Sequence, residues 1–317
     1  MDNGDGSIRA TEGAPAAPRR VAVVCDNTMG IPGGEIDDGL ALLYLLGCRG
    51  PAVEVVLVCA THGNAATGET YGATRALCEA LMPGVPVVRG AEAGDDRLSG
   101  AARALADLAW SAEGPRTTLL SLGAVTDLAA AERLRPGALA RFGKVCLMGG
   151  VTRPLVVGAR IMDELNLSAD PDAACAVLAS GARLLVADAH GCLPLTFSGP
   201  EFLKRLGEGD APGARLVDRA CRPWVERMRA VWGVDGFVGW DVLAAVAAAR
   251  PEQVATVPRR VVCHRRFLAA GLLCEAGPDV PDALARTVHL VVARDAARTA
   301  RDVYACWERA LAGVGDA

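Results

Sequence analysis

Carboxylate residues follow the first strongly apolar segment of the chain and also open the helix predicted after it. The apolar segment Val21–Cys25 leads directly into Asp26, and the pair Asp37 and Asp38 follows a glycine-rich loop. Acidic residues at the start of a helix commonly do no more than cap free backbone N–H groups and complement the helix dipole. Asp26 instead follows a strand, where a buried carboxylate is costly without a proton, hydrogen bonds or a cation. Clustered carboxylates without Cys or His partners favour Ca²⁺ or Mg²⁺.

Other polar residues stand at similar places further along the chain. His62 and Asn64 follow the second apolar segment, Glu164 and Asn166 precede a turn into another helix, and Asp241 stands before a further helix. Each of these residues taken alone fits ordinary turn or N-cap chemistry. Their joint appearance after strands of one sheet favours a shared site.

The elements that must position these residues alternate between short Val/Leu-rich segments and longer Ala/Leu/Arg-rich segments. This alternation predicts an α/β fold, with an open, mostly parallel sheet and helices on both faces. The predicted strands are Val21–Cys25, Val53–Ala60, Val85–Arg89, Thr117–Leu122, Lys144–Met148, Ala182–Ala187, Arg259–Cys263 and Val288–Ala293. The predicted helices are Asp38–Leu46, Thr67–Leu81, Arg97–Trp110, Val125–Arg133, Pro171–Ala179, Ala214–Val231, Val242–Ala248 and Ala296–Leu311. In such sheets the ligand binds beyond the carboxyl ends of the strands.

Composition narrows the class of protein. The 317 residues are 51% hydrophobic and carry a net charge of −4, which argues against nucleic acid as a partner and favours a small molecule. The apolar runs are too short to span a membrane. We predict a disordered tail over residues 1–20 without a signal peptide, followed by one domain over residues 21–317. Eleven cysteines without a CxxC pair indicate reduced thiols and a cytoplasmic location.

The polar segments, taken in order, resemble the inosine–uridine preferring nucleoside hydrolase family over most of the chain. The matching segments are Cys25-Asp26, Ile36-Asp37-Asp38, Gly63-Asn64, Gly123-Ala-Val-Thr126, Met148-Gly-Gly150, Glu164-Leu-Asn166 with Asp170-Pro171, and Asp241. The resemblance implies a Rossmann-like α/β fold, a bound Ca²⁺ ion and hydrolysis of the N-glycosidic bond between ribose and a nucleobase. It also implies a homo-oligomer, either a dimer or a tetramer.

The same resemblance implies a role for each matching residue. Asp26 would bind Ca²⁺ and act as general base on the metal-bound water. The other metal ligands implied are Asp38, Asp241 and the backbone carbonyl of Leu122. The residues implied to bind the ribose are Asp37, Asn64, Glu164 and Asn166 through its hydroxyls, and Met148 through packing against the sugar.

This sequence departs from the family pattern at three places. Asp26 and Asp37 are eleven positions apart, further than in the family, so residues 27–35 form an insertion at the predicted metal site. An alternative register would place Thr28 at the position of the base. Trp240 stands where the family commonly has the histidine that protonates the departing base. No clear counterpart exists for the asparagine after Met-Gly-Gly or for the His-Gly segment after the third strand.

Trp240 matters most, because an indole cannot donate a proton usefully at neutral pH. Trp240 either stacks on the base or is a core aromatic. We predict that His62, beside Asn64, is the residue best placed to assist departure of the base, with His190 as second choice. Alternatively, a loop residue assists departure, or the leaving group needs no acid.

Two other functions compete with hydrolysis. A nucleoside-binding or regulatory protein would keep the metal and ribose residues but lack the proton donor. A phosphatase of the haloacid-dehalogenase type would use Asp26-Asn27-Thr28 as its nucleophile motif. That motif normally has a second Asp where Thr28 stands, and only Lys144 and Lys204 are present to supply its phosphate-binding lysine.

Overall fold

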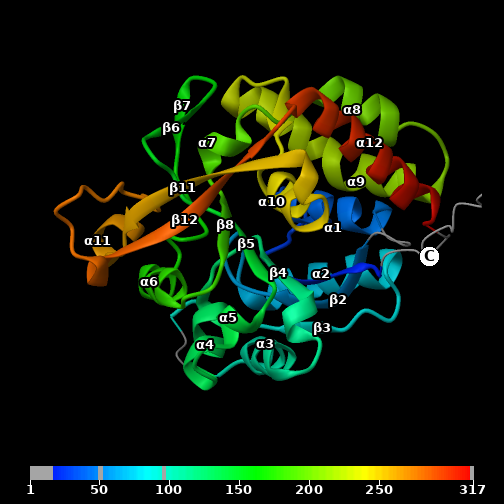
Figure 1. Ribbon diagram of the computed structural model, residues 1–317. Coiled ribbons are helices and arrows are strands. Elements are labelled where there is room, and N and C mark those ends of the chain that lie inside the picture. The colour runs from blue at the N-terminus through cyan, green and yellow to red at the C-terminus, as the bar shows by residue number, and fades with distance from the viewer. Residues whose placement is uncertain (1–16, 49–52, 95–97, 315–317) are drawn as a thin grey trace, which may run out of the picture.

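The computed structural model of the chain describes residues 17–48, 53–94 and 98–314. Its centre is an eight-stranded sheet with the strand order β11-β12-β8-β5-β4-β1-β2-β3 (Figure 1). The strands of this sheet are β1 (Arg19–Cys25), β2 (Val53–Ala60), β3 (Val87–Arg89), β4 (Thr117–Ser121), β5 (Lys144–Met148), β8 (Leu184–Ala187), β11 (Val254–Val262) and β12 (Ala285–Ala293). Neighbouring strands pair in parallel, except for β11, which pairs antiparallel with β12. The predicted fold class is therefore confirmed.

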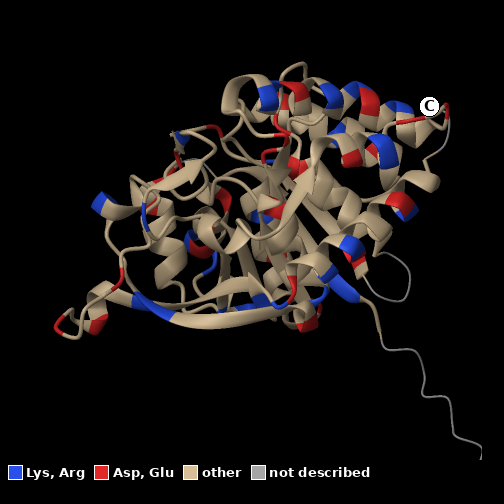
Figure 2. Cartoon of the chain, turned by 90° about the horizontal axis from the view of Figure 1, so that it is seen from above, with Lys and Arg blue, Asp and Glu red and all other residues tan. Residues whose placement is uncertain are grey.

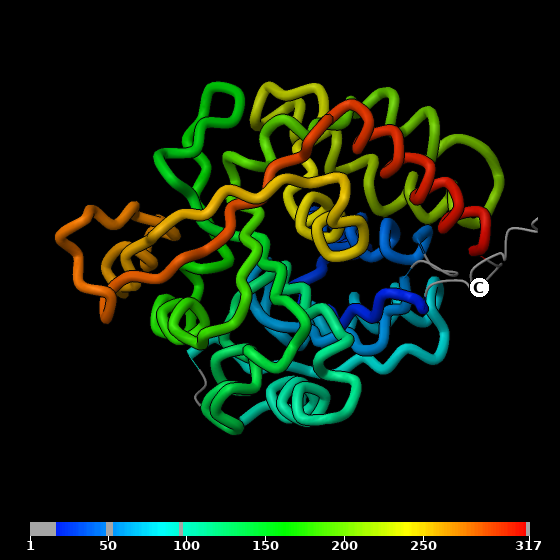
Figure 3. Tube along the Cα trace, viewed as in Figure 1, coloured from blue at the N-terminus to red at the C-terminus, as the bar shows by residue number. Residues whose placement is uncertain are grey.

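Helices cover both faces of the sheet, as the tube in Figure 3 also shows. The apolar core on one face includes residues of α1 (Asp37–Gly47), α2 (Thr67–Leu81), α8 (Gly199–Leu206), α9 (Pro212–Arg227), α10 (Trp240–Ala249) and α12 (Ala296–Ala312). The other face packs against α3 (Gly100–Trp110), α4 (Thr126–Leu134), α5 (Ala138–Arg141), α6 (Pro171–Ala179) and α11 (Arg265–Leu268). Because the strands of the sheet are buried on both faces, their sequences are continuous apolar runs and do not alternate between apolar and polar residues.

The chain reverses direction across the sheet beside β1. From β1 it continues to β2 and β3 on one side, and then crosses to β4 and β5 on the other side. The reversal point lies at the carboxyl ends of β1 and β4, which is the usual ligand position in a doubly wound sheet. Asp26 follows β1, Leu122 follows β4, and both residues therefore lie at the switch point.

The predicted bounds agree best with the structure in segments where hydrophobic residues recur with a clear helical period. Helices α2 and α6 begin and end at the predicted residues. The predicted strand Arg259–Cys263 is the second half of a longer β11, whose edge position and exposed side chains weaken the apolar signal. Arg97, the predicted start of α3, lies outside the described residues, and the helix begins at Gly100 after Ser99, whose side chain accepts a hydrogen bond from the Ala102 N–H.

Two small ribbons and several short helices were not predicted from the sequence. The ribbons pair β6 (Leu155–Val157) with β7 (Arg160–Met162), and β9 (Thr196–Ser198) with β10 (Gly236–Val238). The predicted helix Ala214–Val231 is divided into α9 and the π-helical turn η2 (Met228–Trp232). The remaining elements are α7 (Ala189–Cys192) and the 3₁₀ turns η1 (Gly114–Arg116), η3 (Pro251–Gln253) and η4 (Asp282–Leu284). Segments of three or four residues are too short for a period to show.

Most of the predicted N-terminal tail, residues 1–16, lies outside the described residues. Its last two residues, Arg19 and Arg20, form the start of β1, where Arg20 makes an ion pair with Glu54. Charges of both signs are interspersed over the chain in Figure 2. Within the described ranges, the structure has no helix that is both long and apolar enough to cross a bilayer.

Candidate active site

Three carboxylates converge at the switch point of the sheet. One oxygen from each of Asp37, Asp38 and Asp241 lies within 4.8 Å of the others. Asp37 and Asp38 stand in the first turn of α1, and Asp241 stands in the first turn of α10. The amino ends of both helices therefore face the cluster, and their dipoles partly offset its negative charge. Asp38 and Asp241 are almost completely buried.

Asp26 is held against this cluster by backbone contacts. Its Oδ2 accepts a hydrogen bond of 2.6 Å from the Asn64 N–H, and its own N–H donates to Oδ1 of Asp38 at 3.1 Å. A side chain at Gly63 or Gly123 would overlap the Asp26 carboxylate, so both glycines are needed for this close approach. The closest group of carboxylates therefore contains Asp37 rather than Asp26, because Asn64 holds the Asp26 carboxylate to one side.

The charge of this cluster is not offset by basic side chains. Among the described residues, none of its four carboxylates forms an ion pair with Lys or Arg. Burial raises the pKa of Asp26 and of Asp37 to about 7. Burial first, and then neighbouring aspartates, also raise the pKa of Asp38 and Asp241. An all-oxygen, buried and unneutralised donor set fits a hard divalent cation.

These pKa shifts predict a pH dependence for the metal-free protein. In the unfolded chain an aspartate titrates near pH 3.9, so between about pH 4 and 7 the folded state binds more protons than the unfolded state. The free energy of unfolding should therefore fall as pH rises through this window, by at most about 4 kcal/mol for each of Asp26 and Asp37. Urea unfolding in chelator at pH 5 and pH 7.5 measures the difference. Equal stability at the two pH values would contradict it, and added Ca²⁺ should raise stability most at pH 7.5.

Asn166 joins the ends of β4 and β5. Its Nδ2 donates to the carbonyl oxygens of Leu122 at 2.8 Å and Met148 at 3.0 Å, and it also contacts Sδ of Met148. The Leu122 carbonyl, predicted as a metal ligand, thus already accepts one hydrogen bond and retains a second lone pair. Asn64 approaches from the other side, with its Nδ2 3.4 Å from Oδ2 of Asp38.

Glu164 is engaged with backbone N–H groups. Its Oε1 accepts from Gly150, Asn166 and Leu167, and its Oε2 accepts from Ser168, at 2.9 to 3.0 Å. A carboxylate in this position stabilises the turn that carries Asn166 and links this turn to the segment after β5. Its contacts within the protein therefore support a positioning role beside the predicted contact with ribose.

The imidazole of His62 is buried and bound away from the carboxylates. Its Nε2 lies 3.0 Å from Oγ1 of Thr126, and that hydroxyl donates to Oδ2 of Asp170 at 2.8 Å. Because Thr126 gives its proton to Asp170, Nε2 must donate to Thr126. Burial lowers the pKa of His62, so the ring is neutral near pH 7. This arrangement favours a positioning role over the predicted role as proton donor.

His190, the second choice, is also engaged within the protein. Its Nδ1 accepts from the Thr152 N–H at 3.4 Å and lies 3.7 Å from Oδ2 of the buried Asp188. Burial lowers its pKa, so it too is neutral near pH 7. Its contacts fix the turn at Thr152.

Trp240 is half-buried in the first turn of α10, directly before Asp241. It packs with Trp232, Leu193 and residues of the β6–β7 ribbon in a small apolar cluster, and the side chains of Trp240, Trp232 and Leu193 also contact one of the two main cores. The sequence did not indicate Trp232 or the ribbon, because the ribbon strands are three residues long, Trp232 ends the π-helical turn η2, and only the fold brings them beside α10. An aromatic surface beside the carboxylates suits a flat nucleobase.

Hydrogen bonds anchor the inserted loop, residues 27–35, to helix α9. The Trp224 Nε1–H donates to Oε2 of Glu35, and Arg227 on the same helix donates to the carbonyl of Gly33 at 2.9 Å. The Thr28 hydroxyl donates to the Glu35 carbonyl, which occupies it within the loop. Asn27 is fully buried, and its Nδ2 has no hydrogen-bond partner among the described residues. The sequence indicated no role for Asn27 in the predicted metal or ribose site, and its free donor beside Asp26 is visible only in the structure.

The phosphatase hypothesis lacks its lysine at this site. Lys144 is the first residue of β5, at the opposite end of the strand from the carboxylates, and its Nζ donates to the carbonyl of Ala247. Lys204 lies on α8, outside the sheet.

A doubly wound sheet with an acidic cluster at its switch point is typical of enzymes that act on small molecules. The family model of the inosine–uridine preferring nucleoside hydrolases matches residues 23–301, and the chain belongs to this family. The resemblance described above is thereby confirmed, and the chain is by class an enzyme, an N-glycosyl hydrolase of nucleosides.

Individual relatives are distant but cover most of the chain. Uridine nucleosidase 1 of Arabidopsis thaliana is 26% identical over 68% of this chain and 72% of its own length. Probable uridine nucleosidase 2 of Oryza sativa subsp. japonica is 24% identical over 80% of this chain and 81% of its own. A purine-preferring ribonucleoside hydrolase from Gardnerella vaginalis superposes with a TM-score of 0.77 and 20% identity, over 93% of this chain and all of the other.

Proposed function

We propose that this protein hydrolyses ribonucleosides with the help of a bound Ca²⁺ ion, releasing ribose and the base. The observation that carries this proposal is the group of carboxylates of the half-buried Asp37 and the buried Asp38 and Asp241, with Asp26 beside them, at the switch point of the sheet. No basic residue neutralises them among the described residues, and such a group is costly to bury unless it serves a cation.

The residues that would hold the ion are Asp26, Asp38 and Asp241 together with the Leu122 carbonyl. Asp37, which lies within reach of the same point, is proposed to bind a ribose hydroxyl. When bound, Ca²⁺ would ligate the vicinal diol of the sugar and acidify the attacking water. Asn64, Glu164 and Asn166 complete the proposed ribose site, with Met148 packing against the ring.

Asp26 is proposed as the general base. Its carboxylate is oriented by the Asn64 N–H and lies close against the backbone of Gly63 and Gly123. A base fixed in this way can take the proton of the attacking water without first reorganising. The surrounding carboxylates would then stabilise the positive charge that develops on the sugar as the glycosidic bond breaks.

Departure of the base is proposed to proceed without His62 as acid. The ring already donates to Thr126, and its lowered pKa keeps it neutral. We propose that Trp240 stacks on the base and that the leaving group departs without a strong acid. Uracil suits this mechanism better than purines, because its anion is stabilised by two carbonyl groups.

The His62→Gln variant tests the role of His62. Glutamine can still donate to Thr126, so the expected loss of turnover is less than about tenfold, with an unchanged pH profile. A loss of 10²-fold or more, together with loss of one limb of the pH profile, would instead identify His62 as the acid. Steady-state kinetics with uridine from pH 5 to 9 distinguish the two results.

Uridine is the first substrate to test, because two of the relatives are named as uridine nucleosidases. Reducing-sugar release should be measured on purine and pyrimidine ribonucleosides, with Ca²⁺ and with chelator. We expect release from uridine that requires Ca²⁺. A protein that binds nucleosides in the presence of Ca²⁺ but releases no sugar from any of them would match the alternative of a catalytically weakened binding protein, which the loss of the family histidine at Trp240 favours.

Two further predictions remain to be measured, one from the resemblance and one from the cysteines. A homo-oligomer, dimer or tetramer, is expected from size-exclusion chromatography with light scattering. The cytoplasmic location is expected from the free state of all eleven cysteines.

A further inference from the structure

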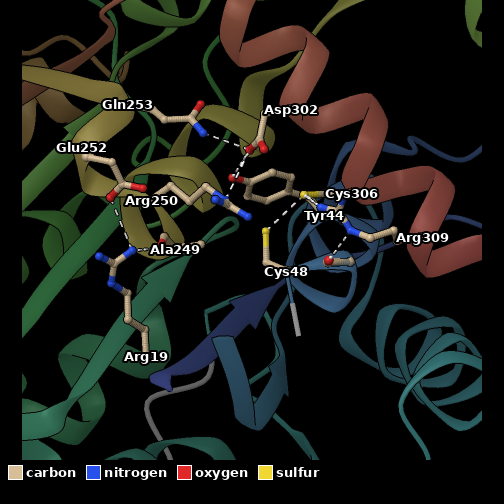
Figure 4. A network of polar contacts seen from close by, with 11 residues as sticks. Arg19, Tyr44, Cys48, Ala249, Arg250, Glu252, Gln253, Asp302, Cys306 and Arg309 are labelled. Atoms are coloured by element: carbon tan, nitrogen blue, oxygen red, sulfur yellow. Dashed lines mark hydrogen bonds and ion pairs between the residues drawn. The ribbon is translucent and has the colours of Figure 1, made fainter. Parts of the chain in front are cut away.

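Two cysteines from distant parts of the chain lie in contact behind the sheet. Cys48 caps the carboxyl end of α1, and Cys306 stands in the third turn of α12, 258 residues further along. Their Sγ atoms are 3.2 Å apart, as Figure 4 shows. This is close enough for a hydrogen bond between thiol and thiolate, and a small movement would bring the sulfurs to bonding distance.

Arginines surround this thiol pair, which we call the Cys48–Cys306 pair. Arg309, one turn after Cys306, donates from Nη2 to Sγ of Cys306 at 3.0 Å. Arg250, at the end of α10, lies on the Cys48 side (Figure 4) and is held by an ion pair of 3.4 Å to Asp302. Tyr44 donates to the same Asp302 carboxylate. Positive charge at Arg250 stabilises a thiolate at Cys48, while Arg309 contacts its partner Cys306.

The two sulfurs are not equivalent. The hydrogen bond from Cys306, and then Arg250, lower the pKa of Cys48 to about 6, whereas the pKa of Cys306 is raised by the same contact. Burial raises the pKa of eight other cysteines: Cys25, Cys59, Cys78, Cys146, Cys175, Cys192, Cys221 and Cys263. Cys48 is thus suited to be the nucleophile and Cys306 to be the thiol that resolves its oxidised form.

The pair lies close to the surface. Both sulfurs belong to buried residues, but the side chains of Arg250 and Asp302 beside them are 29% and 24% exposed. An oxidant of the size of two water molecules needs only a small local opening at this edge, whereas a bulky disulfide needs a larger one.

We infer that Cys48 and Cys306 form a reversible disulfide when the protein meets hydrogen peroxide. The Cys48 thiolate attacks one peroxide oxygen, the O–O bond breaks, and hydroxide leaves to be protonated to water, so that Cys48 becomes a sulfenic acid. The Cys306 thiol then attacks the Cys48 sulfur, and the sulfenic oxygen leaves as a second water. In total, two thiols are oxidised to one disulfide and one peroxide is reduced to two waters.

The bond would join α1 to α12 without entering the carboxylate site. Asp37 and Cys48 stand at opposite ends of α1, whose eleven residues span about 16 Å. Closing a loop of 258 residues restricts the unfolded chain strongly, so the oxidised protein should unfold at a temperature several degrees higher. This inference does not depend on the proposed hydrolysis.

The test uses the native full-length protein. Treatment with a few equivalents of hydrogen peroxide, alkylation of the remaining thiols and peptide mapping without reduction should give a peptide that links Cys48 to Cys306, with a mass two hydrogens lower. Dithiothreitol should reverse both this mass change and the rise in melting temperature. Before oxidation, Cys48 should be alkylated by iodoacetamide faster at pH 7 than Cys306 and the eight cysteines whose pKa burial raises.

Two variants and one internal reference complete the test. In Cys306→Ser, oxidation of Cys48 should end at the sulfenic or sulfinic acid. In Cys48→Ser, Cys306 should stay unmodified. Cys175 and Cys263, whose sulfur–carbonyl contact is also 3.2 Å but whose pKa values are both raised, should oxidise more slowly. Peroxide that modifies other cysteines while Cys48 and Cys306 stay reduced, or a linkage of either one to a different cysteine, would overturn the inference.

Discussion

Replacing Asp38 with asparagine should abolish metal-dependent hydrolysis. Asp38 is buried, its Oδ1 accepts from the Asp26 N–H, and its carboxylate belongs to the closest group of three. An amide keeps the shape and can still accept the hydrogen bond from Asp26, but it removes one negative charge from the predicted ligand set. We expect kcat/KM for uridine to fall by at least about 10²–10³-fold, as for loss of one preorganised electrostatic partner.

The same variant should change stability in a direction that a damaged fold would not. Without metal, Asp38→Asn relieves repulsion between buried carboxylates, so the chelated variant should melt at or above the temperature of the chelated wild type. The rise in melting temperature that Ca²⁺ gives the wild type should disappear. Asp279→Asn, which removes an exposed charge far from the cluster, is the matched control and should keep both activity and the Ca²⁺ response. An Asp38→Asn variant that retains both would show that the cluster is not the metal site.

Replacing Asp26 with asparagine should lower turnover more than it lowers substrate binding. The amide oxygen can still accept the short hydrogen bond from Asn64, so the local structure is preserved. What is lost is the ability to take a proton from water, and we expect kcat to fall by about 10²–10⁴-fold. KM should change by much less, because the ribose contacts of the other residues remain.

Thr28→Val is the matched control for Asp26→Asn, because it tests the alternative register in which Thr28 occupies the position of the base. The Thr28 hydroxyl donates to the Glu35 carbonyl within the inserted loop, so its loss should change kcat by only a few-fold. A large fall in kcat for Thr28→Val with near-normal turnover for Asp26→Asn would reverse the assignment. Single-turnover kinetics, which separate the chemical step from product release, give the clearest comparison.

The sheet and the approximate position of the site were predictable from sequence because their signals are local. A strand such as Val21–Cys25 is a continuous apolar run, and the aspartate after it has no local reason to be there. The carboxyl ends of parallel strands share one edge, so Asp26 and Asn64 were expected to lie close together, and the family resemblance added Leu122. The helix that begins at Asp37 could also be predicted locally, since its acidic start and apolar body lie within eleven consecutive residues.

What could not be predicted depends on contacts between distant segments. The ring of His62 is turned toward Thr126 and Asp170, which lie 64 and 108 positions further along, and nothing at Thr61-His62-Gly63 shows this. The inserted loop reads as flexible from its glycines, yet Trp224 and Arg227 anchor it from α9. The contact between Cys48 and Cys306 likewise exists only because α1 packs on α12.

The most direct test of the central claim is a calcium titration of the chelated protein, with uridine hydrolysis and melting temperature followed on the same samples. The carboxylate cluster predicts that both rise together with one midpoint, and that neither responds in Asp38→Asn. Full hydrolysis in excess chelator, or activity that returns at a Ca²⁺ concentration unrelated to the stabilisation, would contradict the claim that Asp26, Asp38 and Asp241 hold the ion used in catalysis.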